Sequence, residues 1–397
     1  MQIPPTRLGR NNEFILVVDA SNIRAGGGVT HLCQLLAAAN PEESGFKRVV
    51  VLGGRLSLEN LPSRNWLQKI YVPLLDKGLL FRLLWQQLIL PRYVRINSAD
   101  ALFSPGGTRP YRIHVPSFVM SQNLLPFEQG EASRFGLLSR MRLKLRLLRL
   151  SHAHSMRRAY GLIFLTRYAK DQVLKLVARN THRIAIIPHG VEERFFSRPR
   201  AAPPVSTYSS QNPFRFLYIS TVDMYKHQWQ VARAVSLLRR QGLPIEIDFI
   251  GPAYPRALRR LLKTMRELDP TGDHLHYRGP VAFTELHMAY QKADAFVFAS
   301  SCENLPNILL EAMAAGLPIA SSNKGPMPEI LGDAGVYFDP ESVAQIATAL
   351  QPLFEQAELR SALAHRAYDK ARQYSWQQCA RDTFCFIADG IRAAATK

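Results

Sequence analysis

FASSCENLPNILLEAMAAGLPIASSNKGPMPE, residues 298–329, is the stretch that decides how this chain folds. The apolar residues 295–299 predict a buried strand, and the polar residues 300–304 predict a loop after it. A helix is expected over 306–315, because Pro306 suits a first helical turn and Gly316 suits a helix end. In an open parallel sheet, such a helix starts at the carboxyl end of a strand. Its free N–H groups there favour an anionic ligand such as a phosphate.

Two carboxylates flank this predicted anion site: Glu303 stands before the helix and Glu311 stands within it. Glu311 follows Asn307 by four residues, so the two side chains share one helix face. A carboxylate is repelled by a diphosphate, so we expect Glu303 and Glu311 to bind hydroxyl groups of a sugar or a ribose. Spacing alone favours a plainer alternative, in which Glu303 is a helix N-terminal charge and Glu311 a solvated helix residue.

The two glutamates with seven residues between them, the following LEAMAAGLPIA and the pair Pro328–Glu329 resemble the signature of retaining glycosyltransferases of family 4. The resemblance extends over nearly the whole chain and is strongest from residue 183 to residue 340. It implies the fold called GT-B, in which two Rossmann-like, doubly wound α/β domains face each other across a cleft. A C-terminal helix is then expected to cross back to the N-terminal domain.

The resemblance also implies roles for single residues. Glu303 would contact the donor hexose and Lys226 the departing diphosphate, and these two are the predicted catalytic residues. The family has an Arg five residues before this Lys, where the chain has Thr221, so the phosphate clamp is one cation short. Without the resemblance, Lys226 reads as an ordinary surface lysine. The predicted donor-binding residues are Gly27, Gly28, Gly279, Val281, Asn304, Leu305, Asn307 and Glu311, with Glu311 on the nucleotide ribose.

Two glycine-containing loops support these assignments. Gly26–Gly28 lie between a predicted strand at 13–19 and a predicted helix at 29–39, where glycine lets the backbone approach a ligand closely. A plain tight turn is an equal alternative for this loop. Gly279–Pro280–Val281 resembles the family loop whose backbone reads the nucleotide base.

Two further positions depart from the family pattern and are candidates for contact with the sugar. Gln122 ends a predicted strand at 117–121, where the family often has a His-Asp pair. A purely structural role for the Gln122 amide is an equal alternative. His189 stands in IIPHGVEERF, which resembles the domain-closing segment of the family, at a position where Asn is more frequent.

A chain of 397 residues is too long for one ordinary core, so two domains are expected. The predicted N-terminal acceptor-binding domain covers residues 1–197. Residues 198–213 are rich in Pro and Ser and predict a linker. The predicted nucleotide-sugar-binding domain covers 214–375, and 376–397 form the returning helix.

Positive charge is concentrated in the first half of the chain. Residues 1–200 carry 30 Lys and Arg against 12 Asp and Glu, whereas the remainder carries 20 against 19. The first half is therefore expected to face an anionic partner.

A basic helix predicted over 134–159 holds eight Lys and Arg and no acid. One of its apolar stripes is expected to pack inward: Leu137, Leu138, Met141, Leu145 and Leu148. The second stripe, Leu143, Leu147 and Leu150, is expected to meet anionic lipid. The membrane-facing basic residues would be Arg140, Arg142, Lys144, Arg146 and Arg149. In the alternative, the helix is packed on both sides and its arginines are solvated.

The sequence thus predicts an enzyme that moves a hexose, with retention, from a GDP- or UDP-linked sugar to a polyprenyl-diphosphate-linked glycan. The sequence of residues 302–320 resembles that of bacterial enzymes of O-antigen, capsule or exopolysaccharide synthesis. With no apolar run of membrane-spanning length and no signal-peptide core, a cytoplasmic protein bound peripherally to the inner face of the cytoplasmic membrane is expected.

No cofactor and no metal are expected, because the sequence has no Asp-x-Asp pair and its four cysteines lack metal-ligand or disulfide spacing. Cys33, Cys302, Cys379 and Cys385 are expected to be reduced thiols. Two alternatives stay open: a soluble GT-B enzyme that makes a free saccharide, and a basic non-catalytic protein that binds nucleic acid. The second lacks an aromatic and basic reader motif, so no nucleic acid is expected as a partner.

Overall fold

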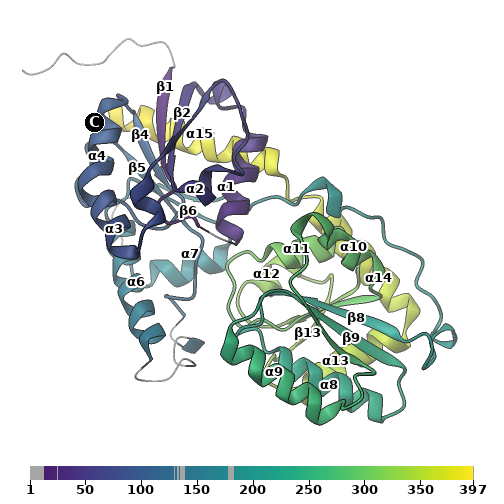
Figure 1. The fold of residues 1–397 in the computed structure, drawn as a ribbon. Coiled ribbons are helices and arrows are strands. Elements are labelled where there is room, and N and C mark those ends of the chain that lie inside the picture. Colours follow the sequence, from purple (N-terminus) through teal and green to yellow (C-terminus); the bar gives the residue numbers. More distant parts are fainter. Residues whose placement is uncertain are drawn as a thin grey trace, which may run out of the picture.

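The computed structural model describes residues 13–24, 26–128, 130–131, 134, 139–177 and 183–396, and the backbone alone of Arg140. These residues form two parallel sheets, each covered by helices (Figure 1). Both sheets have the strand order of a doubly wound α/β domain. The predicted pair of Rossmann-like domains is confirmed.

The first sheet has seven strands in the order β3-β2-β1-β4-β5-β6-β7, all parallel. Its central strand β1 is apolar and buried on both faces, as is typical of a parallel sheet between helices. Val17 pairs with Val50 on one side and with Leu102 on the other. The strands are β1 (Phe14–Asp19), β2 (Phe46–Gly53), β3 (Leu67–Tyr71), β4 (Ala101–Ser104), β5 (Ser117–Ser121), β6 (Gly161–Phe164) and β7 (Arg183–Ile186).

Helices on both sides of this sheet complete the N-terminal domain. Their positions follow from the alternation of strand and helix along the chain, which a parallel sheet requires. They are α1 (Gly27–Ala38), α2 (Arg55–Leu58), α3 (Leu79–Leu84), the π-helical turn η3 (Trp85–Ile89), α4 (Leu90–Ile96), α6 (Arg140–Arg157) and α7 (Arg167–Leu174).

The second sheet has six parallel strands in the order β10-β9-β8-β11-β12-β13. Helices α8, α9 and α13 lie together on one side of it, and α11 and α14 on the other (Figure 1). The strands are β8 (Phe214–Ile219), β9 (Ile245–Ile250), β10 (Leu275–Gly279), β11 (Ala295–Phe298), β12 (Ile319–Ser322) and β13 (Val336–Phe338). The helices are α8 (Gln228–Arg240), α9 (Pro255–Leu268), α10 (Leu286–Lys292), α11 (Asn307–Ala314), α12 (Met327–Leu331), α13 (Val343–Glu355) and α14 (Ala357–Ala371).

The last helix, α15 (Trp376–Ala395), packs on the N-terminal domain beside α1 (Figure 1). The ring of Phe384 lies 5.5 Å from the ring of Phe46, and the ring of Phe386 lies 5.7 Å from that of Phe118. The predicted crossing of the C-terminal helix is confirmed.

The chain passes between the domains at two places that touch each other. The amide of Val191 donates to the carbonyl oxygen of Tyr374 over 3.1 Å. A Cβ on Gly190 would lie 2.1 Å from the backbone nitrogen of Trp376, so only glycine fits this contact. The ring of His189 stacks on Trp376 with 5.5 Å between the ring centres. The two crossings therefore form one compact joint.

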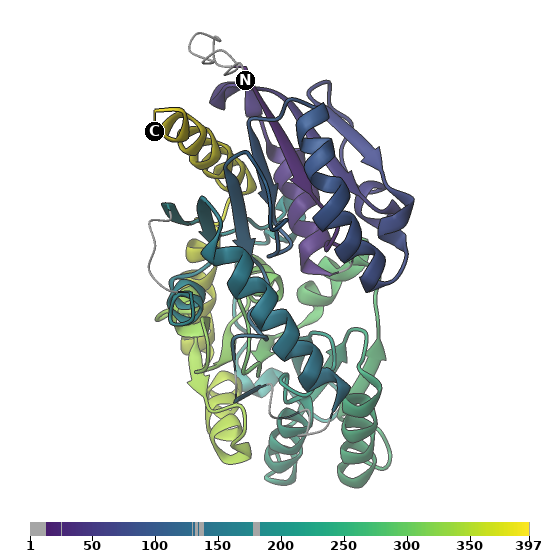
Figure 2. The ribbon, with the colours of Figure 1, turned by 90° about the vertical axis from the view of Figure 1, so that its left-hand side faces the viewer.

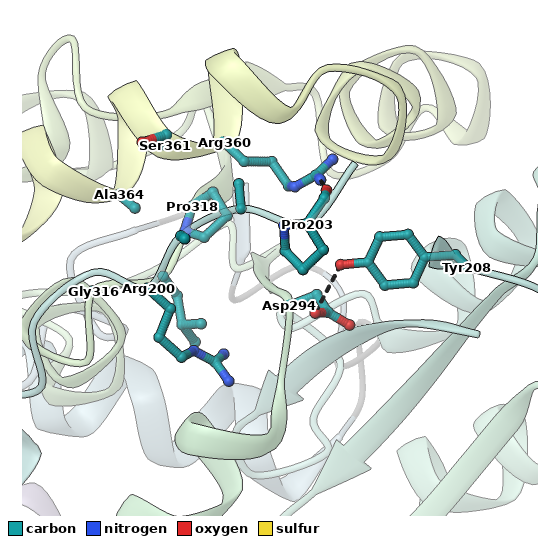
Figure 3. A pocket seen from close by; sticks show the side chains of 12 residues that line it. Arg200, Pro203, Tyr208, Asp294, Gly316, Pro318, Arg360, Ser361 and Ala364 are labelled. Carbon is teal, nitrogen blue, oxygen red and sulfur yellow. Dashed lines mark hydrogen bonds between the residues drawn. The ribbon is translucent and has the colours of Figure 1, made fainter. Parts of the chain in front are cut away.

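Residues 198–213, predicted as a linker, lie against the C-terminal domain (Figure 3). Arg200 donates to two carbonyl oxygens at the end of α10, and Arg360 donates to a linker carbonyl and to two carbonyls at the end of α13. The hydroxyl of Tyr208 donates to Asp294 over 3.1 Å. The pocket of about 150 Å³ between these residues is therefore the place where the linker packs on the domain. Its arginines already donate their hydrogen bonds to carbonyl oxygens.

A proline usually ends or kinks a helix, but the helix before Pro91 continues beyond it. In the structure α3, the π-helical turn at 85–89 and α4 follow one another without a break, so the helix passes through Pro91. Proline lacks the N–H that an α-helix interior needs, and Pro91 stands two residues after the end of the π-helical turn, where the hydrogen-bonding pattern changes. The π-helical turn thus allows a helix that the proline alone argued against.

The basic helix predicted from residue 134 begins later, at Arg140. Ser139 ends the preceding segment and caps the helix, because its hydroxyl oxygen accepts the amide of Arg142 over 3.1 Å. Leu137, Leu138 and the side chain of Arg140 lie outside the described residues. Of the inward stripe, Leu145 is buried and Met141 and Leu148 are half-buried.

The outward stripe of α6 is exposed: Leu143 is 60%, Leu147 59% and Leu150 68% accessible. Lys144 and Arg146 beside it are exposed, and Arg142 and Arg149 are partly so. For the described residues of α6, the leucines therefore divide into an inward and an outward face, and contact with lipid stays a prediction. Within the described ranges no helix has the length and apolar character needed to cross a membrane.

Candidate active site

A cavity of about 460 Å³ lies where the carboxyl ends of the two sheets face each other. Loops after β1 and β5 border it from the N-terminal domain, and loops after β8, β9, β10 and β11 border it from the C-terminal domain. The N-terminal domain contributes Gly26, Gly27, Thr30 and Gln122. The C-terminal domain contributes Ile219, Ser220, Thr221, Lys226, Ile250, Gly251, Pro252, Val281, Phe283, Leu286, Glu303, Asn304, Leu305, Pro306, Asn307, Ile308 and Glu311.

Helix α11 opens onto this cavity at its N-terminus. It begins at Asn307, with Pro306 at the N-cap and no side-chain hydrogen bond to the cap. The positive end of the helix dipole and the first N–H groups are thus directed to the cavity. A Cβ on Gly27 would lie 3.9 Å from the Asn307 side-chain nitrogen, so the two domains approach each other here. An anion held at α11 would touch both domains.

Lys226 and Glu303 form an ion pair inside the cavity, and their side chains are 8% and 14% exposed. The Lys226 ammonium also lies 5.2 Å from the centre of the Phe298 ring. Lys226 stands just before α8 and faces the start of α11, so two helix dipoles and a cation make this corner electropositive. Glu303 supplies the counter-charge to Lys226.

His227 holds Lys226 in position through a strained backbone. Its φ of 52° lies in the left-handed region, which is uncommon for a residue other than glycine. The His227 ring is hydrogen-bonded to the Ser301 hydroxyl at 3.0 Å, which joins the start of α8 to the loop after β11. Burial, and then the charge of Arg134, lower the pKa of His227 to about 4. Sequence reasoning missed this residue, because nothing in TVDMYKHQ signals a left-handed histidine.

Glu311 lies at the other end of the cavity and is almost fully buried. The hydroxyl of Tyr290 donates to its carboxylate over 2.9 Å. Burial raises the pKa of Glu311 to about 7, and the Tyr290 hydrogen bond opposes the rise. A carboxyl group with a pKa of about 7 exists in both protonated and ionised forms at neutral pH. It can therefore bind a hydroxyl group as hydrogen-bond donor or as acceptor.

The loop before α11 is attached to the N-terminal domain. The amide of the Asn304 side chain donates to the carbonyl of Ser121 over 2.6 Å, and the hydroxyl of Thr166 donates to the carbonyl of Asn304 over 3.3 Å. The His189 ring lies 3.0 Å from the carbonyl oxygen of Leu305. Burial lowers the pKa of His189, so the neutral ring supports the loop from behind. His189 does not border the cavity.

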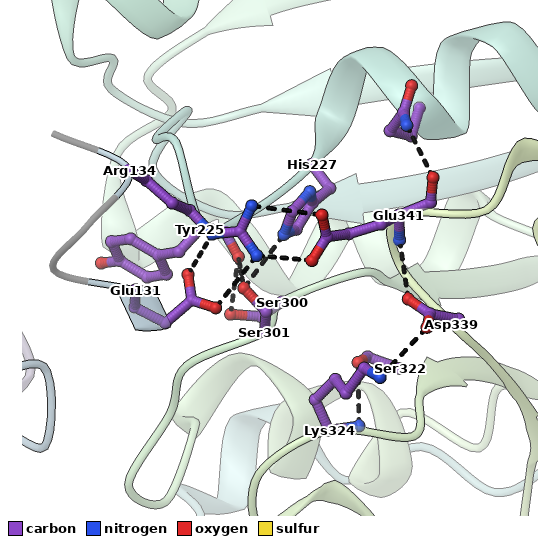
Figure 4. A network of polar contacts seen from close by, with 11 residues as sticks. Glu131, Arg134, Tyr225, His227, Ser300, Ser301, Ser322, Lys324, Asp339 and Glu341 are labelled. Carbon is purple, nitrogen blue, oxygen red and sulfur yellow. Dashed lines mark hydrogen bonds and ion pairs between the residues drawn. The ribbon is translucent and has the colours of Figure 1, made fainter. Parts of the chain in front are cut away.

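Two more contacts join the domains near the site. The Glu329 carboxylate accepts the amides of Arg167 (2.7 Å) and Tyr168 (2.8 Å), which are the first N–H groups of α7. Arg134 binds Glu341 of the C-terminal domain with two hydrogen bonds and holds Glu131 beside it (Figure 4). Sequence reasoning quoted Pro328–Glu329 as part of the signature but assigned Glu329 no partner.

Most of the predicted donor residues border the cavity, but two glycines do not. Gly28 lies behind Gln122, because a Cβ on Gly28 would come within 3.0 Å of the Gln122 side-chain oxygen. Gly279 accepts the amide of Gly251 through its carbonyl over 2.8 Å and so supports the neighbouring wall. Neither glycine borders the cavity itself.

The apolar wall opposite the ion pair was not predicted in full. Phe283 and Leu286 border the cavity after Val281, and the Arg194 guanidinium lies 4.1 Å from the centre of the Phe283 ring. The signal was present in the apolar residues that follow Gly279–Pro280. An apolar and aromatic wall of this kind suits the flat face of a nucleotide base.

Thr221 borders the cavity at the position where the resembled family has an Arg. Among the lining residues, all of which the structure describes, Lys226 is the single basic one. The missing cation therefore has no substitute in the lining, and the N-terminus of α11 has to balance more of an anion's charge.

The thiol of Cys302, which adjoins the site, is buried, and burial raises its pKa well above the ordinary value. A buried thiol with a raised pKa is a small packing residue and a poor nucleophile. All four cysteines lie in the described ranges and are free. In the same ranges, no three His, Cys, Asp or Glu side chains are grouped closely enough to hold a metal ion.

Residues 205–370, which include most of the cavity's lining, match the family model described as glycosyl transferases group 1. The chain carries a group 1 glycosyltransferase domain. The N-terminal half adds the second Rossmann-like domain, and the likeness of more than nine tenths of the chain to solved structures shows the GT-B fold. The family recognition is thereby confirmed, and retention of configuration stays a prediction.

Comparison with curated proteins finds similarity to named glycosyltransferases over part of this chain. The chain is 25% identical over 246 residues to O-antigen chain mannosyltransferase B of Escherichia coli, an alignment covering 60% of this chain and 63% of that protein. Alignments with the first curated relatives span from 25% to 63% of their lengths. Sequence similarity to them is thus partial.

Two solved structures show how far the fold extends. Sucrose-phosphate synthase of Thermosynechococcus elongatus superposes with a TM-score of 0.74 at 15% identity, over 94% of this chain and 97% of that chain. HepE of Anabaena in complex with UDP-glucose superposes with a TM-score of 0.69 at 16% identity, over 93% and 98%. At this identity the two likenesses establish the shared fold.

Proposed function

We propose that this group 1 glycosyltransferase moves a hexose, with retention of the anomeric configuration, from a GDP- or UDP-linked sugar to a polyprenyl-diphosphate-linked glycan. The observation that carries the proposal is the cavity between the domains, where the uncapped start of α11, Lys226, Glu303 and Glu311 meet. The similarity to an O-antigen mannosyltransferase supports a role in bacterial surface polysaccharide synthesis.

When the donor binds, its diphosphate replaces Glu303 as the partner of Lys226. The diphosphate takes the electropositive corner between Lys226 and α11, because two or more negative charges compete there with the single charge of Glu303. Glu303 is then released toward the sugar, whose hydroxyl groups donate to its carboxylate. The donor would thus replace the ion pair of Lys226 with Glu303 by two contacts, one of Lys226 to phosphate and one of Glu303 to sugar.

The rest of the donor follows the walls of the cavity. The base lies along the apolar side formed by Val281, Phe283 and Leu286, and the ribose hydroxyls reach Glu311. Gly27 lets the N-terminal domain close over the diphosphate without a side chain in between. Gln122 offers its amide to the sugar from the same domain.

In the transfer step, the bond between the anomeric carbon and the diphosphate oxygen breaks, and the electron pair leaves with the diphosphate. The acceptor hydroxyl oxygen forms the new bond on the same face of the sugar, and its proton passes to the departing phosphate. Lys226 and the first N–H groups of α11 stabilise the charge that grows on the leaving group. No metal and no protein base takes part in this scheme.

The acceptor is proposed to reach the site from a membrane surface on the side of the N-terminal domain. Helix α6 presents exposed Leu143, Leu147 and Leu150 between basic side chains, a pattern typical of helices that lie on anionic bilayers. The enzyme would then act as a peripheral protein at the inner face of the cytoplasmic membrane.

A thermal unfolding screen against a panel of nucleotide sugars tests the donor half of the proposal. The matching nucleotide sugar should raise the Tm by several degrees at saturation, because it binds only the folded state. Lys226→Ala should lose most of that rise, whereas Lys263→Ala on exposed α9 should keep it. If no nucleotide sugar or nucleoside diphosphate shifts the Tm, the donor assignment is wrong.

Vesicle pelleting separates the acceptor alternatives. Binding to anionic vesicles supports a lipid-linked acceptor, and a protein that stays in the supernatant supports a soluble enzyme that makes a free saccharide. Retention is checked by assigning the anomeric configuration of the product by NMR, and an inverted product would refute it.

A further inference from the structure

A second open cavity, of about 630 Å³, lies in the N-terminal domain. It is bounded by the end of the π-helical turn and α4, by residues 109–114 between β4 and β5, and by Arg158 directly after α6. Arg95, Arg109, Arg112, Arg158 and His114 border it, and no acidic residue does. None of its lining residues belongs to the donor cavity.

Arg109 lies at the base of this cavity and is only 7% exposed. One terminal nitrogen donates to the carbonyl oxygen of Arg158 over 2.8 Å, and the Arg109 amide donates to the Ser155 hydroxyl oxygen. The Nε nitrogen is buried and has no hydrogen-bond partner among the described residues. A buried guanidinium without a carboxylate is costly, which indicates that a counter-charge is missing.

The positively charged side chains that border this cavity also repel one another. Burial, and then the charge of Arg158, lower the pKa of Arg109 to about 10. Burial, and then the charge of Arg95, lower the pKa of His114. Since no acid borders the cavity, an anion from outside the chain is the group that would relieve this repulsion.

Arg158 is held in a fixed orientation by an aromatic side chain. Its guanidinium lies 4.3 Å from the centre of the Tyr111 ring, and it donates to the Tyr111 hydroxyl over 3.2 Å. Tyr111 in turn stacks on His154 of α6, with 5.4 Å between the ring centres. A planar guanidinium fixed by stacking is suited to bidentate binding of phosphate oxygens.

The surroundings of the cavity decide between a soluble phosphate and a membrane lipid. Exposed apolar side chains flank it on the helix that runs from α3 through the π-helical turn, and others lie on α6. The α3–α4 helix and α6 lie on one face of the domain, the face turned to the viewer in Figure 2. The exposed residues are Leu79, Leu80, Phe81, Leu83, Leu84, Leu88, Ile96 and the outward stripe of α6. A soluble phosphate would leave all of them in water.

We propose that this cavity receives the phosphate of an anionic phospholipid headgroup while the leucines around it enter the acyl boundary of the bilayer. The site extends the membrane face beyond α6 to the α3–α4 helix and turns diffuse attraction into binding of a defined group. The inference rests on the membrane association in the proposed function, but on neither the donor nor the transfer reaction.

The test uses a short-chain phosphatidylglycerol below its micelle concentration as a soluble probe of the cavity. Arg95→Gln with Arg112→Gln removes two exposed cations from the lining and leaves the core intact. Arg142→Gln with Arg146→Gln on α6 removes the same charge from the same face but leaves the cavity intact. Arg256→Gln with Arg259→Gln on α9 is the charge-matched control in the other domain.

The lipid probe should raise the Tm of the wild type and of the α6 and α9 variants, and should have little effect on the cavity variant. Binding to phosphatidylglycerol vesicles should fall about tenfold or more in both the cavity and the α6 variants. It should stay unchanged in the α9 control, and vesicles of phosphatidylcholine alone should bind none of them well.

Two results would overturn the assignment. A cavity variant that is stabilised by the lipid probe as strongly as the wild type would show that the phosphate binds elsewhere. Inorganic phosphate that matches the lipid probe at equal concentration would make the site one for free phosphate. Because the cavity variant should keep its Tm rise with the nucleotide sugar, a failed donor screen would be recognised separately.

Discussion

The two domains share one strand order and differ in what their surfaces present. The C-terminal domain is nearly neutral and carries the loops after β8 to β11 that form most of the donor cavity. The N-terminal domain is strongly basic, has a second cavity without acids and exposes leucines on two helices. The shared topology therefore sets where ligands can lie, and the loops and outer helices set which ligands those are.

The largest expected effect lies in the C-terminal domain. Glu303→Ala should lower transfer on the order of 10²–10³-fold or more, because the sugar loses its carboxylate contact in the transition state. Freed from its partner, Lys226 should still bind a nucleoside diphosphate, so protection against thermal unfolding should persist. A radiolabelled or coupled transfer assay measures the first effect, and Glu267→Ala on exposed α9 is the control. Near-normal transfer would refute the role of Glu303.

The next effect distinguishes the two domains at a membrane. Leu143→Ser with Leu147→Ser should weaken binding to anionic vesicles about tenfold or more, because two apolar side chains no longer enter the bilayer. Leu262→Ser, on the half-exposed face of α9 in the other domain, should change nothing. Co-sedimentation across a range of lipid concentrations gives the affinities. Equal losses in both variants would show that the N-terminal domain has no special face.

The pH dependence of stability should have opposite signs in the two domains. Burial lowers the pKa of His31 to about 3 in the folded N-terminal domain, against 6.5 in an unfolded chain. The unfolded state then binds more protons below pH 6.5, so the contribution of His31 to stability is lost as pH falls from there toward 3. For Glu311, whose pKa rises from 4.5 to about 7, the contribution is lost as pH rises from 4.5 through 7.

Single variants make these opposed contributions visible. Between pH 7 and pH 5, the wild type should lose roughly 1–2 kcal/mol relative to His31→Phe and gain a similar amount relative to Glu311→Gln. Denaturant unfolding at each pH provides the free energies, with the same buffer ions throughout. Differences that do not change with pH would show that these groups do not titrate between the folded and unfolded states as stated.

The smallest expected effect concerns the contact between the domains. Glu329→Ala removes the carboxylate that accepts the first two amides of α7, which should cost about 1 kcal/mol, the usual value of a lost helix cap. Amide exchange at the start of α7 should speed up, and the Tm should fall by a few degrees. Glu358→Ala, at the exposed start of α14, is the control. Unchanged amide exchange at the start of α7 would show that Glu329 does not make this contact in solution.

How much the sequence predicted differs between the same two domains. In the C-terminal domain the donor loops are short linear motifs, so Lys226, Glu303, Glu311 and Val281 could be named from their neighbours in the chain. Gly28 and Gly279 were named with them but stand behind the lining, because a motif does not tell which of its residues faces the ligand.

Features made by residues far apart in the chain could not be predicted. The hydrogen bonds from the first amides of α7 reach Glu329, 161 residues away from Tyr168, and the basic cavity of the N-terminal domain gathers Arg95, Arg109 and Arg158 from three segments. The helix through Pro91 could not be predicted for a local reason, because a π-helical turn has no sequence signal. The late start of α6 was readable from Ser139, but the continuous basic pattern concealed it.

The seating of residues 198–213 on the C-terminal domain has a practical meaning for protein engineering. Since Arg200 and Arg360 tie that segment down, bending between the lobes has to occur in the few residues around Gly190 and Tyr374. A chimera that swaps lobes between related transferases should therefore be spliced at those two positions together. Splicing within residues 198–213 would instead separate part of this segment from the C-terminal domain on which it packs.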